Sequence, residues 1–137
     1  MMRTILITLL SVATLSSCSN NSFIDKSLLC STKDFPVKGG FKFISDKTLV
    51  KYNILWDHAK KTEFVHKTLH CYLIANNEIA ISSRDETHNC GLYDSFINIE
   101  SLIYSIPKPD NILTASCGYY DKDLEKKLSQ SINKSNI

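Results

Sequence analysis

The segment "TLVKYNILW" (48–56) constrains the fold more than any other stretch, because its apolar side chains recur at every second residue. An extended chain points successive side chains to opposite faces, so this pattern predicts an amphipathic β-strand. The opposite face carries Lys51 and Asn53. The residues of the apolar face are Val50, Tyr52, Ile54 and Trp56. At strand alternation such a face is typical of a packed core.

A second strand precedes this one. In "GGFKFIS", Phe41 and Phe43 share one face and Lys42 lies on the other. The link "SDK" predicts a turn in which Asp46 hydrogen-bonds to nearby backbone groups. A short link between two alternating segments is typical of a β-hairpin, so we expect 41–44 to pair with the strand at 48–56.

Further strands follow in the same style. We expect a second hairpin, 64–75 against 78–82, with Asn76-Asn77 as its turn. The polar loop 83–95 comes next and is the best candidate for a functional excursion. Segment 96–106 is interpreted as one strand, although its apolar spacing also fits a helix.

The end of the chain changes character. Pro107 and Pro109 interrupt the pattern, because proline cannot continue a central ladder. "ILTASCGYY" predicts a last strand. Leu124, Leu128 and Ile132 follow Asp121 at four-residue spacing, which predicts a short C-terminal helix.

Together these elements predict a mainly β fold: a small antiparallel meander of about five or six strands, barrel-like or sandwich-like, with a short C-terminal helix. We place the β domain at 28–120 and the helix and tail at 121–137. A domain of roughly 90 residues buries only about 60–65% of its unfolded surface, so it is marginally stable unaided.

Five cysteines in a chain of 137 residues bear on this stability. Four of them, Cys30, Cys71, Cys90 and Cys117, form an even set that predicts two disulfides in an oxidising compartment. Four cysteines allow three connectivities. We favour Cys71 with Cys90 and Cys30 with Cys117, and Cys30–Cys71 with Cys90–Cys117 stays open.

The fifth cysteine, Cys18, follows an N-terminal segment with one positive charge on Arg3 and an eleven-residue apolar run over 5–15. As a helix this run would span about 17 Å, short of the ~30 Å hydrocarbon core of a bilayer. Its length is therefore typical of a secretory signal peptide.

The four residues at the end of the apolar run, Leu15-Ser16-Ser17-Cys18, resemble the lipobox of bacterial lipoproteins. The resemblance implies a type II signal peptide over 1–17, cleavage before Cys18, acylation of its thiol and a membrane anchor. Two or more acyl chains would hold such an anchor stably. Residues 18–27 would form a flexible tether. Ser19, where inner-membrane members often have Asp, implies the outer membrane and a periplasmic face, with the extracellular face left open.

A metal site is the sharpest alternative, since His66, His70, Cys71, His88 and Cys90 lie close in sequence. Imidazole and thiolate suit zinc. Two histidines four residues apart in a strand are, however, about 13 Å apart, and thiols outside the cytoplasm tend to form disulfides. We expect no metal and no cofactor.

Catalysis has no clear signature in the sequence. There is no Gly-x-Ser-x-Gly or Cys-x-x-Cys motif. Asp85 and Glu86 near His88 are interpreted as solvent-facing groups of a polar loop. The formal net charge of +2 gives no reason to expect nucleic-acid binding. We therefore expect a protein that is not an enzyme.

Aromatic side chains on loops suggest binding instead. Tyr93, Tyr119 and Tyr120 are the candidate interface residues, because tyrosine often anchors protein interfaces. The leading hypothesis is an envelope lipoprotein that binds an envelope or secreted protein, or a wall component, in the manner of an inhibitor or immunity protein. The alternatives are a small-ligand carrier with an apolar cavity lined by Trp56, Tyr52 or Ile54, and a zinc-dependent enzyme.

Overall fold

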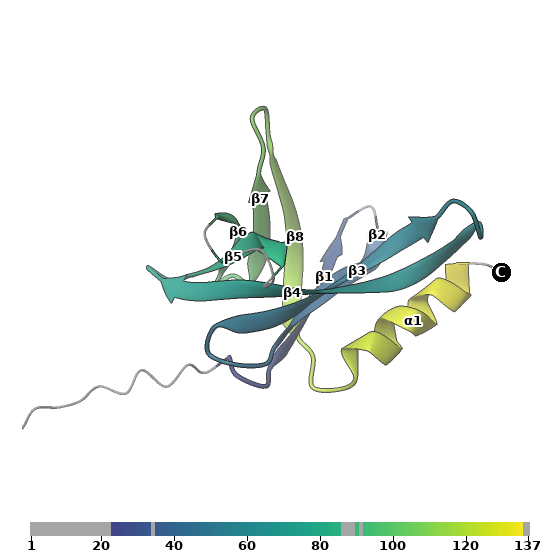
Figure 1. The fold of residues 1–137 in the computed structure, drawn as a ribbon, viewed down its shortest axis with the longest axis horizontal. Helices are drawn as coiled ribbons and strands as arrows, with labels where there is room; N and C mark the ends of the chain where they lie inside the picture. The colour runs from purple at the N-terminus through teal and green to yellow at the C-terminus, as the bar shows by residue number, and fades with distance from the viewer. Residues whose placement is uncertain (1–22, 34, 86–89, 91, 136–137) are drawn as a thin grey trace, which may run out of the picture.

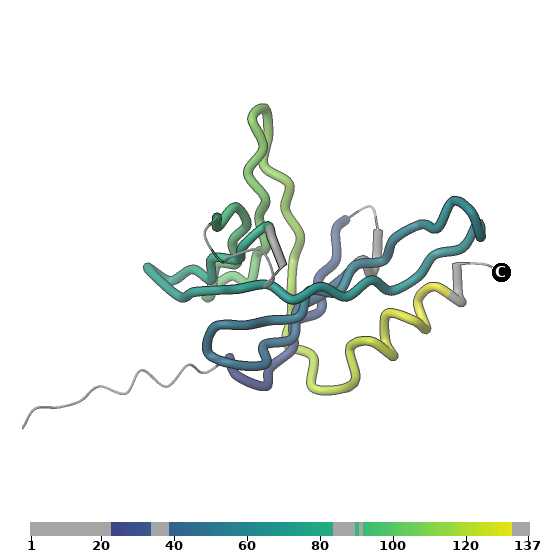
Figure 2. Tube along the Cα trace, in the orientation of Figure 1, coloured from purple at the N-terminus to yellow at the C-terminus, as the bar shows by residue number. Residues whose placement is uncertain are grey.

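The computed structural model describes residues 23–135 except 34, 86–89 and 91. In this part of the chain, eight antiparallel strands form a closed barrel in sequence order, and the last strand pairs back with the first (Figures 1 and 2). One helix follows the last strand. The elements are β1 (Ser27–Thr32), β2 (Phe35–Phe43), β3 (Thr48–Asp57), β4 (Thr62–Ala75), β5 (Glu78–Asp85), β6 (Tyr93–Asn98), β7 (Ile103–Pro107), β8 (Ile112–Tyr119) and α1 (Leu124–Ser135).

The predicted fold class is confirmed, and the barrel has more strands than the sequence predicted. One reason is the turn that divides segment 96–106 into β6 and β7. Asn98 Oδ1 accepts hydrogen bonds from the backbone N–H groups of Glu100 (3.0 Å) and Ser101 (2.9 Å). Leu102 has a φ of 54°, which breaks the extended conformation. Segment 96–106 contains no proline or glycine, so its sequence does not indicate the turn.

The other additional strand is β1, which starts the barrel earlier than the predicted boundary at Leu28. Even before it, Phe23 is packed into the core with 3% of its surface exposed. Backbone hydrogen bonds join Asp25 N–H to the Phe43 carbonyl (2.9 Å) and Phe43 N–H to the Lys26 carbonyl (3.0 Å). The tether predicted over 18–27 is therefore folded from Phe23 onward. The predicted signal peptide, Cys18 and residues 19–22 lie outside the described residues.

The predicted hairpins are confirmed by the pairing of β2 with β3 and of β4 with β5. Asn76 and Asn77 have φ values of 51° and 64°, as a two-residue hairpin turn requires. In the first hairpin, the turn is stabilised by Ser45 and not by the predicted Asp46. Ser45 Oγ accepts hydrogen bonds from the backbone N–H groups of Lys47 (3.2 Å) and Thr48 (3.0 Å).

Aromatic and aliphatic side chains from most of the strands fill the barrel. Phe43 contacts Tyr72 edge to face, with 5.0 Å between ring centroids, and Phe41 contacts Tyr104 in the same way at 5.0 Å. Each fully buried large side chain contributes about 1.5–3 kcal/mol of transfer free energy. The buried set also includes Leu28, Leu49, Ile79, Ile81 and Ile97.

The apolar face of β3 packs outside the barrel, which corrects the predicted core. Leu49 points inward, while Tyr52 packs against Leu124 and Leu128 of α1. The helix therefore covers the outer surface of β2, β3 and β4, as Figure 1 shows. Alternation alone cannot say whether an apolar face meets the barrel interior or a helix outside. Trp56, predicted in the same face, is 49% exposed.

The two disulfides follow the favoured connectivity, Cys30–Cys117 and Cys71–Cys90. The predicted C-terminal helix is also confirmed, and its three spaced apolar residues are buried. In the described part, no helix has the length and apolar character needed to cross a membrane.

Candidate functional site

An open groove of about 720 Å³ lies where β8 leads into α1. We call it the β8–α1 groove. Four parts of the chain line it: the residues at the start of β1, the end of β2, the outer face of β3 and the β8–α1 connection. Its lining residues are Asp25, Lys26, Ser27, Lys42, Tyr52, Tyr119, Tyr120, Asp121, Lys122, Asp123, Leu124 and Glu125.

Tyr119 is the most exposed aromatic side chain of the groove, with 56% of its surface accessible. Its ring stacks on Phe23 with 6.3 Å between centroids, and the Lys26 ammonium lies 5.3 Å from its centroid. The next residue is fixed by a hydrogen bond from Tyr120 N–H to the Ser27 carbonyl (2.9 Å). Tyr119 is therefore held in position while it stays accessible.

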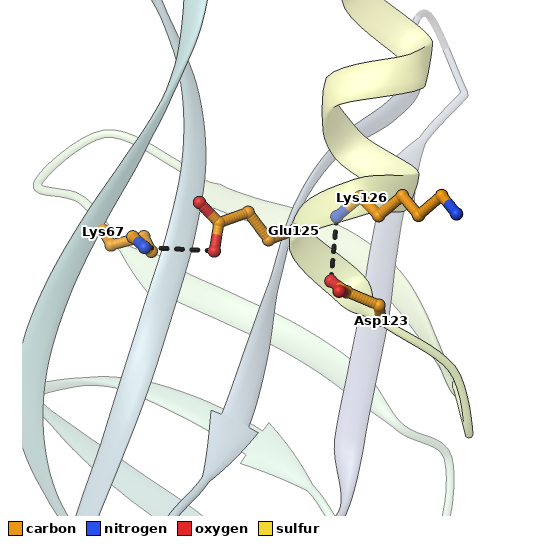
Figure 3. A network of polar contacts seen from close by, with 4 residues as sticks. All are labelled: Lys67, Asp123, Glu125 and Lys126. Atoms are coloured by element: carbon orange, nitrogen blue, oxygen red, sulfur yellow. Dashed lines mark hydrogen bonds and ion pairs between the residues drawn. The ribbon is translucent and has the colours of Figure 1, made fainter.

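The start of α1 forms one side of the groove, and two polar contacts fix it (Figure 3). Asp123 Oδ1 accepts a hydrogen bond from Lys126 N–H (2.9 Å), which caps the helix. Glu125 makes an ion pair with Lys67 of β4, with 3.0 Å between Oε2 and Nζ. This contact raises the pKa of the Lys67 ammonium, first through the hydrogen bond and then through the carboxylate charge. Because both side chains are about half exposed, the pair positions the helix more than it stabilises it.

Tyr52 forms the buried part of the groove, with 8% of its surface exposed. Burial raises the pKa of its phenol, and the Glu125 and Asp123 carboxylates act in the same direction against the opposing charge of Lys67. The hydroxyl therefore stays protonated at neutral pH and keeps its ability to donate a hydrogen bond.

The charges of the groove are mixed. Both acidic and basic side chains line it, so neither sign dominates, as one sign would at a site for nucleic acid. Acidic members are Asp25, Asp121, Asp123 and Glu125, and basic members are Lys26, Lys42 and Lys122. A site with charges of both signs beside the accessible ring of Tyr119 is better suited to binding another protein.

The structure brings two of the three candidate interface residues together. Tyr119 and Tyr120 both line the β8–α1 groove. Tyr93 starts β6, where it pairs with Ser82 of β5, and it is not part of the groove. Two of the residues singled out from the sequence therefore line the groove, and Tyr93 lies outside it.

The described residues considered for zinc make other contacts in the structure. Cys71 and Cys90 are joined to each other, so neither provides a thiolate. The His70 ring nitrogens lie 2.7 Å from Thr68 Oγ1 and 2.7 Å from the Ser82 carbonyl oxygen. His88 lies outside the described residues, as does Glu86 of the possible acid/base group. Among the described residues, no three His, Cys, Asp or Glu side chains gather as a metal site would require.

A small cavity among the described residues bears on the carrier hypothesis. A cavity of about 100 Å³ lies among Phe41, Lys51 and Tyr104. Sites for drug-sized ligands have volumes of about 300–1,000 Å³. Tyr52, one of the residues that the hypothesis places on a cavity wall, is among the lining residues of this cavity, whereas Trp56 is not.

Sequence reasoning missed an exposed apolar surface at the end of the β3–β4 hairpin. Leu55 pairs with Phe64 across the two strands, and their exposed fractions are 41% and 40%. Trp56, next to Leu55 in the sequence, lies on the opposite face of the hairpin and is 49% exposed. The signal was present in the sequence, because aromatic residues flank the charged turn 58–61 at the end of a long hairpin.

Comparison of the chain with protein-family models, curated proteins and solved structures gives no match. Function is therefore inferred from the residues and their geometry.

Proposed function

We propose that this protein is a lipid-anchored, non-enzymatic binding protein of the bacterial cell envelope, and that it binds another extracytoplasmic protein at the β8–α1 groove. The observation that carries the binding role is Tyr119, which is exposed and yet held by Phe23 and Lys26. The lipobox-like residues ending at Cys18 support the anchor.

Tyr119 has the properties of an interface anchor. Tyrosine provides a large amphipathic contact area, and such residues dominate the binding energy of many interfaces. The stacking on Phe23 and the nearby Lys26 ammonium restrict its motion before any partner arrives. A side chain that is already ordered loses less conformational entropy on binding.

The proposed anchor and the groove lie close together along the chain. Phe23, which packs under Tyr119, is five residues after Cys18. Five residues reach at most about 18 Å even when fully extended. A lipid on Cys18 would therefore keep the groove near the membrane surface. The partner we propose is thus a protein that can reach this surface.

The binding role is tested by placing a photo-crosslinking amino acid at position 119 in cells that make the full-length protein. We expect a discrete crosslinked species between this protein and one polypeptide. The matched control carries the same amino acid at exposed Asp110, in the turn between β7 and β8. The same crosslinks from both positions, or none from position 119, would contradict binding at the groove.

The anchor has its own test. Cells fed an alkyne-tagged fatty acid should label the wild-type protein, and Cys18→Ala should abolish the label and leave unprocessed precursor. Cys30→Ala, a change at a disulfide cysteine, should keep the label on whatever protein accumulates. Normal processing of the Cys18→Ala variant would refute the anchor without bearing on the groove.

A further inference from the structure

Lys51 places a charged group on the inner face of the barrel. It pairs with Phe41 of β2, which is 2% exposed and belongs to the interior core. Directly paired residues of antiparallel strands project to the same face. The Lys51 side chain therefore lies on the side that the other strands fill with apolar groups.

The contacts of this ammonium are with one aromatic residue. Lys51 Nζ donates to Tyr104 Oη at 3.1 Å and lies 5.5 Å from the ring centroid of Tyr104. In the parts of the chain that the structure describes, the ion pair recorded is Lys67–Glu125, and no carboxylate is paired with Lys51. A cation that is partly removed from water is stabilised by an opposite charge nearby.

The cavity of about 100 Å³ lies beside this ammonium and has further polar groups on its wall. Thr32 Oγ1 is buried and has no hydrogen-bond partner within the described residues. Asn53 also lines the cavity. Tyr104 Oη accepts the Lys51 hydrogen bond, so its own hydrogen remains for another acceptor. The cavity thus has several donors, while Phe41 and Ala115 supply an apolar wall.

We propose that this cavity binds a carboxylate group with a short apolar tail. Its single negative charge would match the single ammonium of Lys51. Two carboxylate oxygens would accept hydrogen bonds from Lys51 and from Tyr104 or Thr32, and the tail would contact Phe41 and Ala115. The volume equals the share of about three water molecules in liquid water, which suits a ligand such as propionate. This site is independent of the proposed function at the β8–α1 groove.

The proposal is tested by titrating the folded protein with sodium propionate at constant ionic strength and following backbone amide resonances by NMR. We expect saturable shifts centred on Thr32, Lys51 and Tyr104. Propionamide has nearly the same shape without the charge, so it should produce no saturable shifts at these residues. Equal responses to the two compounds, or shifts that do not saturate, would overturn the proposal and mean that the cavity holds water only.

Two variants tie the response to the named groups. Lys51→Met should weaken propionate binding by about tenfold or more, because it removes the charge and keeps the length of the side chain. Tyr104→Phe keeps the ring against Phe41 and should weaken binding by a smaller factor, so it serves if Lys51→Met does not fold. The control, Lys60→Met, changes an exposed turn residue and should bind as the wild type does. Wild-type affinity in both Lys51→Met and Tyr104→Phe would overturn the assignment.

The carboxylate could belong to a free organic acid or to the end of a polypeptide. A short peptide ending in alanine with a free carboxyl group, compared with its amide, distinguishes these sources. Displacement of propionate by the acid and not by the amide would assign the site to a polypeptide terminus. Displacement by neither would assign it to a small acid.

Discussion

Cys30 and Cys117 face each other as paired residues across β1 and β8, the two strands whose contact closes the barrel, and a disulfide joins them. The bond connects residues 87 positions apart, so it links the beginning of the barrel to its end. Cys30 is buried, with 6% of its surface exposed. The seam between the first and last strands is therefore both hydrogen-bonded and covalent.

Replacing both of these cysteines by alanine should lower the free energy of unfolding by about 4–5 kcal/mol, because a long loop gains much entropy in the unfolded chain. Urea unfolding of the two proteins measures the difference. The comparison is Cys71→Ala with Cys90→Ala, whose loop has a sequence separation of 19 and should cost about 3 kcal/mol. A larger loss from the shorter loop would contradict this account.

Gly40 determines how closely α1 approaches the barrel. A Cβ at this position would collide with the Leu28 carbonyl oxygen and lie 2.9 Å from Cδ2 of Leu124. Gly40→Ala should therefore destabilise the protein by about 1–3 kcal/mol and increase hydrogen exchange in α1. Gly118→Ala is the matched control, since a Cβ there meets nothing within 4 Å. Equal stability of the two variants would mean that the helix does not depend on this approach.

The fold was predictable where local chemistry decides it. Asn76-Asn77 forms the turn that its residue types predict, and Leu124 and Leu128 are buried by the helix that their spacing predicts. The sequence could not show which face of β3 points into the barrel, because both faces carry buried apolar contacts: Leu49 on one and Tyr52 on the other. Only the position of α1 distinguishes those faces, and that position is a tertiary feature.

The candidate site was predictable in part for a similar reason. Tyr119 and Tyr120 stood out as aromatic residues near the end of the last strand. Their partner in the groove, Phe23, was assigned to a tether, because a lone apolar pair in a polar stretch gives no periodicity. The inward position of Lys51 follows from its register with Phe41, and it was missed because the opposite, apolar face of β3 was assigned to the core.

The contribution of the α1 cap to the free energy of unfolding should be measurable by itself. Asp123→Ala removes the acceptor for Lys126 N–H and should destabilise the protein by about 1 kcal/mol, whereas Asp123→Asn should retain most of the stability. Thermal or urea unfolding gives both values. The control, Asp121→Ala, changes an exposed carboxylate before the helix and should have a smaller effect. Equal losses from the two alanine variants would contradict the assigned cap.

Tyr52 should make stability depend on pH in the alkaline range. Burial, together with Glu125 and Asp123, raises the pKa of its phenol above the ordinary value of 10.0, so the folded protein holds this proton more tightly than the unfolded chain does. The resulting contribution to stability is complete below pH 10 and is lost as the pH rises through the folded-state pKa. We expect the wild type to lose more stability than Tyr52→Phe as the pH is raised from about 9 to above 10, because the variant keeps the ring and lacks the phenol. Urea unfolding at a series of pH values measures both proteins, and the titration of lysines common to both largely cancels in the difference. If the two curves run parallel across this range, the Tyr52 phenol does not contribute to the pH dependence of stability.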